Sequence, residues 1–305
     1  MRKETELLYV QYKPLLFSLA YRMLGSVTDA EDIVHDAMIA FGKSMVRTDI
    51  ENPRAYLCKT VTNLCLNRLQ SASYKREAYS GQWLPEPIDT GDASSDPFGV
   101  WLQKESLSTA YLLLVDQLTY IERAVFLLRE VFAYDYREIV DVLDKSVVNC
   151  RKIYSRAKTK MAPLAAEEDA SVNEDGLRKT AAVGREQVLE RFLEALKNGD
   201  IWTTLELLSD QAVLLVDGGG KVTTVPKPIV GASLIAYFLV AIAANTQALS
   251  FVCFAEINGN PGLVVNGPKG PMHVVSFHFC KDKIKAVYIM ANPDKIRHFG
   301  AYDCI

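Results

Sequence analysis

Two spacings of apolar side chains divide this chain. Up to about residue 163, apolar positions recur every three or four residues, the period of one face of a helix. From about residue 180, two further helical stretches, Arg185–Lys197 and Trp202–Leu208, precede runs in which apolar and polar positions alternate. Alternation is typical of strands with one buried face. The chain is therefore predicted to be multidomain, with all-α helical domains first and an α+β domain last.

The alternating runs predict strands interrupted by one helix, which is expected at Ser233–Ala244. We expect the strands to form an antiparallel meander. They are predicted at Ala212–Val216, Val222–Val225, Leu249–Glu256, Leu263–Asn266, Met272–Lys281 and Ile284–Met290.

Capping residues predict where the N-terminal helices begin. Gly25–Val27 breaks the first helical hairpin, and Thr28–Glu31 has the form of a capping box that opens the next helix. Asn52 followed by Pro53 predicts an N-cap and first turn for a long helix that continues to about Glu77.

Composition predicts two linkers and three domains. Residues 78–100 are rich in Gly, Pro, Ser and Asp, and residues 164–179 follow Pro163 and include an acidic run. These linkers separate helical domains at 1–77 and 101–163 from a C-terminal domain at 180–305. A length of 305 residues is consistent with two or three domains.

A helix-turn-helix is predicted near the end of the second helical domain. Tyr136–Leu143 is a short amphipathic helix, Asp144 lies in the turn, and Ser146 is a suitable N-cap for the helix that follows. On that second helix one side is apolar and the other polar. The apolar side holds Val147, Cys150, Tyr154, Ala157 and Met161, and the polar side holds Lys145, Asn149, Lys152, Arg156 and Lys160.

Local charge makes this helix a candidate for nucleic-acid binding. Lys145–Lys160 contains six basic residues and no acidic residue, although the whole chain has a formal net charge of −3. Phosphate groups respond to the local field more than to the total charge. The helix starting at Pro53 is a second candidate, because Asn and Arg side chains on it can read base edges and its tyrosines can stack on bases. A solvated helix with tyrosines in the core explains the same spacing.

Several motifs together resemble a known family. Ala20–Ala37, Asn52–Leu69 and the helix-turn-helix at 134–161 are similar to the extracytoplasmic-function (group 4) sigma factors of bacterial RNA polymerase. The resemblance narrows to a subgroup with a fused C-terminal SnoaL-like domain. It does so through WLPEP (Trp83–Pro87), DGGGK (Asp217–Lys221) and NPDKI (Asn292–Ile296).

The resemblance implies a role for each helical site. One acidic helix face would bind the clamp coiled coil of the largest subunit of core polymerase, through Asp29, Glu31, Asp32 and Asp36. From the residues alone, this face would be interpreted as a solvated surface. The flap of the second subunit is a further expected contact. Part of region 2 would open and read the −10 element: Arg54, Tyr56, Lys59, Asn63, Asn67 and Arg68. The region 4 helix-turn-helix would bind the −35 element: Lys145, Asn149, Arg151, Lys152, Ser155, Arg156 and Lys160.

Two departures from the family pattern affect the −35 site. Asp144 occupies a turn position often held by Gly, and Asp tolerates the left-handed conformation. Ile153 stands where many relatives carry Arg, which predicts lower DNA affinity and a shallower salt dependence. Arg151 lies at the edge of the polar face, where a phosphate contact is expected rather than a base contact.

The C-terminal domain is expected to be a regulator and not an enzyme. SnoaL-like domains share the nuclear-transport-factor-like cone, a curved sheet around an apolar pocket. His273, His278, Asp210 and Tyr237 are candidates to point inward, but strand alternation places the two histidines on opposite faces, so no acid–base pair is predicted. We expect no catalytic residue, no cofactor and no metal site; a small-molecule ligand is possible.

The three short motifs predict a regulatory contact between the C-terminal domain and the linker that fixes the spacing of the DNA-binding domains. As simple turns and an extended segment, the motifs would have no such role. The residues concerned are Trp83, Leu84, Pro85, Glu86, Pro87, Asp217, Gly218, Gly219, Gly220, Lys221, Asn292, Pro293, Asp294 and Lys295.

The remaining expectations concern compartment and function class. The cysteines show no zinc-ligand spacing and are expected to be reduced, and neither a signal-peptide core nor a membrane span is predicted. The protein is therefore expected to be cytoplasmic. An alternative to a sigma factor is a one-component DNA-binding regulator whose SnoaL-like domain is a ligand sensor or an enzyme.

Overall fold

The computed structural model describes residues 2–45, 50–71, 79, 81–91, 107–168, 175–245, 251–268 and 270–299. It divides into two compact units. The N-terminal unit comprises Met1–Ala78, Val100–Leu102 and Tyr111–Pro163, and the C-terminal unit comprises Tyr79–Gly99, Gln103–Ala110 and Leu164–Ile305. The two predicted helical domains thus lie in one unit, whereas most of the predicted linker at 78–100 belongs to the other.

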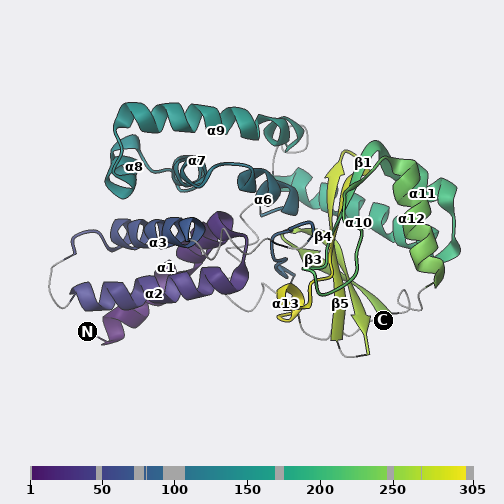
Figure 1. The fold of residues 1–305 in the computed structure, drawn as a ribbon, viewed down its shortest axis with the longest axis horizontal. Coiled ribbons are helices and arrows are strands. Elements are labelled where there is room, and N and C mark those ends of the chain that lie inside the picture. The colour runs from purple at the N-terminus through teal and green to yellow at the C-terminus, as the bar shows by residue number, and fades with distance from the viewer. Residues whose placement is uncertain are drawn as a thin grey trace. The chain divides into compact units, whose positions relative to one another are not determined.

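The elements of the N-terminal unit are helices (Figure 1), and α3 contacts α1, α2, α7 and α8. They are α1 (Arg2–Leu24), α2 (Val27–Met45), α3 (Pro53–Gln70), α6 (Thr109–Asp116), α7 (Tyr120–Phe126), the π-helical turn η1 (Leu127–Val131), α8 (Tyr136–Leu143) and α9 (Val147–Glu168). The guanidinium of buried Arg123 on α7 donates to the carbonyl of Met23 on α1 and to Asp116. This side chain joins segments about 100 residues apart.

The helix starts follow the capping predictions with one correction. Gly25 takes a φ of +67° where α1 ends, and the Asn52 side chain accepts from the Ala55 N–H at 3.0 Å to cap α3. The prediction of Thr28 as the cap of α2 is wrong, because the helix begins at Val27 and the Ser26 hydroxyl accepts from the Asp29 N–H. The predicted extension of α3 to Glu77 reaches residues outside the described ranges.

The C-terminal unit is a six-stranded sheet with helices against it. In chain order its elements are α10 (Asp175–Asn198), α11 (Ile201–Leu207), β1 (Leu208–Asp217), β2 (Ile229–Val230), α12 (Ala232–Asn245), β3 (Val252–Ile257), β4 (Asn260–Gly267), β5 (Gly270–Cys280), β6 (Lys283–Met290) and α13 (Pro293–Ile296). The strand order is β2-β1-β6-β5-β4-β3. Helices α10, α11 and α12 lie on one side of the sheet and α13 lies on the other (Figure 1).

Two predictions about the sheet are corrected. Strand β1 pairs in parallel with β6, so the antiparallel meander is limited to β3, β4, β5 and β6. The predicted strand Val222–Val225 does not form, because the Lys221 and Val222 N–H groups both donate to the Gly218 carbonyl and turn the chain. The strand that pairs with this side of β1 is β2, a few residues later.

Residues 81–91, predicted as linker, pack against the sheet. Thr90 and Ile88 exchange backbone hydrogen bonds with Glu256 and Asn258, and Asp89 forms an antiparallel bridge with Ile257, so this segment extends the β3 edge. The Leu84 side chain is 1% exposed. The segment is therefore part of the C-terminal fold.

Two further observations bear on the compartment expectations. Cys58, Cys65, Cys150 and Cys280 are free, but Cys253 is disulfide-bonded, so the expectation of reduced thiols is wrong at that position. In the described part of the chain, no helix combines the length and apolar character that crossing a membrane requires.

Candidate functional site

The predicted helix-turn-helix forms, and its turn has the predicted geometry. Asp135 and Glu138 make a capping box at the start of α8. Asp144 ends α8 in the left-handed region, with φ +52° and ψ +50°, and the Ser146 hydroxyl accepts from the Asn149 N–H at 3.3 Å. Asp thus supplies the conformation that Gly would supply more readily.

Helix α9 presents the predicted two faces. Cys150, Ala157 and Met161 are buried, and Val147 and Tyr154 are partly buried. Lys145 is half-buried near the turn. The exposed members of the predicted −35 site are Asn149, Arg151, Lys152, Ser155, Arg156 and Lys160.

Two members of the −35 set have partners inside the protein. The Lys160 ammonium is 2.7 Å from the Glu122 carboxylate, and this contact holds the pKa of Glu122 below its usual range. The Arg151 guanidinium lies over the Tyr136 ring at 5.4 Å. In contrast, the side chains of Asn149, Lys152 and Arg156 make no hydrogen bond or ion pair within the described ranges. Their side-chain donors therefore face solvent without a partner in the described part of the chain.

The predicted −10 residues on α3 differ in exposure. Arg54, Lys59, Asn67 and Arg68 are exposed and Asn63 is half-buried. Arg54 lies over the Tyr134 ring at 5.7 Å, which connects α3 to the segment before α8.

Tyr56 packs within the N-terminal unit. Its hydroxyl is 2.8 Å from the Ser44 hydroxyl, and its ring centroid is 5.7 Å from that of Phe41. These contacts support the interpretation of Tyr56 as a core residue.

One residue on the acidic face of α2 contacts one residue of the predicted −10 set. Asp29 and Arg68 form an ion pair at 2.5 Å, whereas Glu31, Asp32 and Asp36 are exposed. One member of the predicted polymerase-binding set and one member of the predicted −10 set are thus each other's partner.

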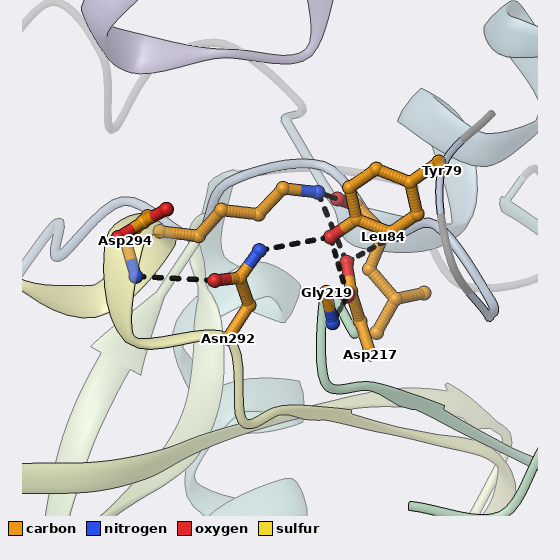
Figure 2. Close-up of polar contacts among 7 residues, drawn as sticks. Tyr79, Leu84, Asp217, Gly219, Asn292 and Asp294 are labelled. Carbon is orange, nitrogen blue, oxygen red and sulfur yellow. Dashed lines mark hydrogen bonds and ion pairs between the residues drawn. The ribbon is translucent and has the colours of Figure 1, made fainter. Parts of the chain in front are cut away.

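The three short motifs meet at one buried carboxylate, that of Asp217 (Figure 2). Its side chain has no exposed surface. One oxygen accepts from the Tyr79 hydroxyl at 2.5 Å and the Gly219 N–H at 2.9 Å, and the other accepts from the Leu84 N–H and the Lys295 ammonium, both at 2.9 Å. We call Tyr79, Leu84, Asp217, Gly219, Asn292 and Lys295 the Asp217 network.

The cation of this network is enclosed by the linker. The Lys295 ammonium also donates to the Leu84 carbonyl at 2.6 Å, and it lies 4.5 Å from the Tyr79 ring centroid and 4.8 Å from that of Trp83. Two aromatic faces and a carboxylate are favourable surroundings for a buried ammonium. Trp83 in WLPEP is therefore explained as a partner of Lys295.

Asn292 links the network to the terminal helix. Its amide donates to the Tyr79 hydroxyl at 3.0 Å, and its carbonyl oxygen accepts from the Asp294 N–H to cap α13, which begins at Pro293. Burial and the hydrogen bond to Asp217 raise the pKa of Tyr79, so this hydroxyl stays protonated as a donor. Tyr79 is therefore bound within the Asp217 network, after the end of α3 at Gln70.

The DGGGK turn requires glycine because neighbouring atoms leave no room for a Cβ or because the backbone has a positive φ. Gly219 has φ +60°, and a Cβ on it would overlap the Asn292 side chain; a Cβ on Gly218 would overlap the Val222 carbonyl. Gly220 also has a positive φ, +71°. The Asp217 carboxylate accepts a hydrogen bond from the Gly219 N–H, so this N–H has its partner within the same turn.

The rest of the linker motif is held by additional contacts. Pro85, Glu86 and Pro87 are buried, and the Pro87 carbonyl lies 2.8 Å from the His298 ring. At the outer edge, Lys221 and Asp294 form an exposed ion pair that lowers the pKa of Asp294.

One residue outside the motifs was missed by sequence reasoning. The Asn258 side chain accepts from the Ile88 N–H at 2.9 Å and donates to the Leu107 carbonyl at 3.0 Å. It lies in a β-turn with a φ of +53°, and an Asn–Gly pair was the available signal.

One face of the sheet and helices α10 and α12 line a partly open cavity of about 240 Å³. Its lining is almost entirely apolar, and His273 is the titratable residue among the described lining residues. His278 lies on the other face with Ser276, whose hydroxyl is 2.9 Å from that of Thr109. Asp210 and Tyr237 are exposed, so the four candidate polar residues are not brought together.

Comparisons with known proteins agree with the resemblance to sigma factors. Residues 8–74 match the Sigma-70 region 2 family, and residues 108–161 match the Sigma-70 region 4 family. The ECF RNA polymerase sigma factor SigJ of Mycobacterium tuberculosis is 30% identical over 293 residues, covering 92% of this chain and 89% of the relative. The probable ECF sigma factor SigI of the same species is 26% identical, with 93% and 92% covered. The crystal structure of M. tuberculosis SigJ superposes with a TM-score of 0.77 at 26% identity, covering 95% of this chain and 97% of that one.

Proposed function

Because the chain belongs to the extracytoplasmic-function sigma factors and directs RNA polymerase to promoters, we propose how its residues divide that task. Helix α9 contacts the −35 element, α3 contacts the −10 element, and the Asp217 network regulates both through the segment that joins them. The observation that supports the regulatory part most directly is the burial of Asp217 against residues of this connecting segment.

At −35, the unpaired exposed side chains of α9 are the proposed contacts. Asn149 near the start of the helix is suited to pair with an adenine edge, and Arg156 with a guanine or a phosphate. Lys152 is suited to a phosphate, as is Arg151, whose position over Tyr136 sets it at the edge of the face.

At −10, Asn63, Asn67 and Lys59 are the proposed contacts of α3, together with Arg54 and Arg68 once their present partners are exchanged for DNA. Glu31, Asp32 and Asp36 form the proposed contact with the clamp coiled coil of core polymerase, and the flap is the proposed contact of region 4. Action on the polymerase places the working compartment in the cytoplasm.

The N-terminal unit as described is a closed form. The −10 and −35 elements lie about 25 base pairs apart, on the order of 80 Å at 3.4 Å per base pair. A compact unit of this size has a radius of gyration of roughly 14 Å. Regions 2 and 4 must therefore separate on the polymerase, which breaks contacts such as Arg123 with the Met23 carbonyl and Arg54 with Tyr134.

Separation requires freedom in the segment between the regions, and the Asp217 network limits that freedom. With Tyr79 and residues 81–90 held by the C-terminal unit, fewer residues remain to span the distance between the regions. The fused domain thereby controls how far apart the two DNA contacts can move.

Run-off transcription with purified core polymerase tests the assignment of the two elements. Asn63→Ala should impair open-complex formation and leave binding to a −35 duplex unchanged, whereas Asn149→Ala should weaken −35 binding. Equal losses in both assays for Asn63→Ala would contradict a −10 role and favour a one-component regulator. Lys13→Ala, on α1 outside both proposed surfaces, is the control.

A further inference from the structure

The cavity in the C-terminal unit has the chemistry of a binding site for a small apolar molecule. Phe192, Phe238 and Phe277 line it among aliphatic side chains, and Thr223, Thr224 and His273 are its polar lining residues. A cavity of about 240 Å³ is larger than the roughly 150 Å³ that accommodates benzene, so it has room for about ten non-hydrogen atoms.

The lining also determines which charges are tolerated. Neither a carboxylate nor an ammonium or guanidinium group is among the described lining residues. A charged ligand would lose its hydration without gaining a counter-charge. The His273 imidazole makes no hydrogen bond to any residue that the structure describes, and burial lowers its pKa, so it is neutral at pH 7. It can exchange one hydrogen bond with a ligand hydroxyl or carbonyl.

The walls of the cavity are continuous with the Asp217 network. Val216 lines the cavity and immediately precedes Asp217, and Ala291 lines it and immediately precedes Asn292. Val222 to Val225 complete this wall directly after the glycine turn. The Val225 carbonyl accepts a hydrogen bond from the Gln82 side chain of the connecting segment, at 3.2 Å.

We propose that this cavity binds a compact, uncharged, largely aromatic molecule with one hydroxyl or carbonyl group, and that binding stabilises the Asp217 network. The cavity exists in the state in which the network is formed and the 222–225 wall is held by Gln82. A ligand that binds this state and not the opened one must stabilise it by mass action. Such a ligand holds the connecting segment on the sheet, a regulatory consequence that rests on the proposed function.

Calorimetric titration of the full-length protein with 2-naphthol tests the binding step. We expect saturable binding of one molecule per chain, and much weaker binding of the 2-naphthoate anion. Ala243→Phe on the cavity wall should weaken 2-naphthol binding at least tenfold. Ala244→Phe, the same change at the next and exposed residue of α12, is the matched control and should leave binding unchanged. His273→Leu should reduce the preference for 2-naphthol over naphthalene.

Hydrogen exchange of the Leu84 and Gly219 amides, both of which donate to Asp217, tests the coupling. With free 2-naphthol at ten times its dissociation constant, exchange through opening of the network should slow about 11-fold. At the same free 2-naphthol concentration, the slowing in Ala243→Phe should be no more than about twofold. Protection of both amides in that variant without ligand shows that the domain is folded, and Val265→Phe on β4 provides a second way to fill the cavity.

Two results would overturn the proposal. Unsaturable binding, or binding equally strong in Ala243→Phe and Val265→Phe, would exclude the cavity as the site. Tight binding that leaves both exchange rates unchanged would exclude the coupling. Neither measurement involves polymerase or DNA, so failure here is distinct from failure of the promoter assays.

Discussion

The polar face of α9 and the Asp217 network contain similar charged side chains in opposite surroundings. On α9, Lys152 and Arg156 are exposed and unpaired within the described chain. In the network, Asp217 is fully buried and makes four hydrogen bonds, one of them to Lys295. The first arrangement leaves charge available to a partner from outside, and the second uses charge to hold two parts of the same unit together.

This contrast has an energetic consequence. An exposed side chain can be replaced with little effect on folding, because water solvates whatever remains. A buried charge that loses its partner stays buried and unpaired, so the network should respond strongly to single substitutions. The two regions are therefore expected to separate in experiment into changes of DNA affinity and changes of stability.

The largest effect is expected for Asp217→Asn. The change leaves the Lys295 ammonium buried without its counter-charge and presents an NH2 group to N–H donors, which should destabilise the network by about 3–5 kcal/mol. Native-state hydrogen exchange of the Leu84 amide measures this loss. Asp294→Asn, which removes an exposed carboxylate of the same region, is the control. Similar exchange in the two variants would show that burial does not set the strength of the network.

A somewhat smaller loss is expected for Gly219→Ala. The left-handed backbone alone costs a non-glycine residue about 1–2 kcal/mol. The new Cβ would also overlap Asn292, which adds about 1–3 kcal/mol of packing strain. Gly199 has a similar φ of +68°, and a Cβ there would meet open space, so Gly199→Ala measures the free-energy cost of the left-handed backbone alone. Urea denaturation compares the two, and equal losses would argue against a tight contact at Asn292.

On the exposed side of the comparison, Asn149→Ala should affect DNA binding and not folding. Loss of a paired hydrogen bond to a base should cost about 1–3 kcal/mol of affinity and relax specificity at one base pair. Fluorescence anisotropy with a −35 duplex measures the affinity. Lys160→Ala on the same helix should have a smaller effect, because its ammonium is already paired with Glu122. A larger effect of Lys160→Ala would reverse this assignment.

The smallest effect concerns the exposed Lys221–Asp294 pair and its pH dependence. The pair lowers the folded-state pKa of Asp294, so its contribution is present above the unfolded pKa of about 3.9 and is lost as pH falls through the folded pKa. Lys221→Met should reduce stability by less than about 1 kcal/mol at pH 7. The stabilities of wild type and Lys221→Met should converge once the pH has fallen below the folded-state pKa of Asp294. A difference that persists there would show that the pair is not electrostatic in origin.

Local sequence signals were sufficient for many elements. The helix-turn-helix, the left-handed Asp144, the Asn52 cap and the split of His273 and His278 between two sheet faces all depend on nearest neighbours and residue periodicity. Local reasoning failed where a distant segment decided the outcome. Val222–Val225 has strand-like residues, but the Gly218 turn and the Gln82 contact hold it as cavity wall instead.

The sequence by itself determined the helical faces, the turn chemistry and which three short motifs are unusual for a linker or a hairpin. Only the tertiary structure decided that these motifs meet at Asp217, that Tyr79 joins them, and that their neighbours line a cavity. Periodicity and capping act within a few residues and can be read along the chain. Apart from Gly219 in the same turn, the partners of Asp217 come from positions more than 130 residues before it and more than 70 after it, and only folding brings them within hydrogen-bonding distance.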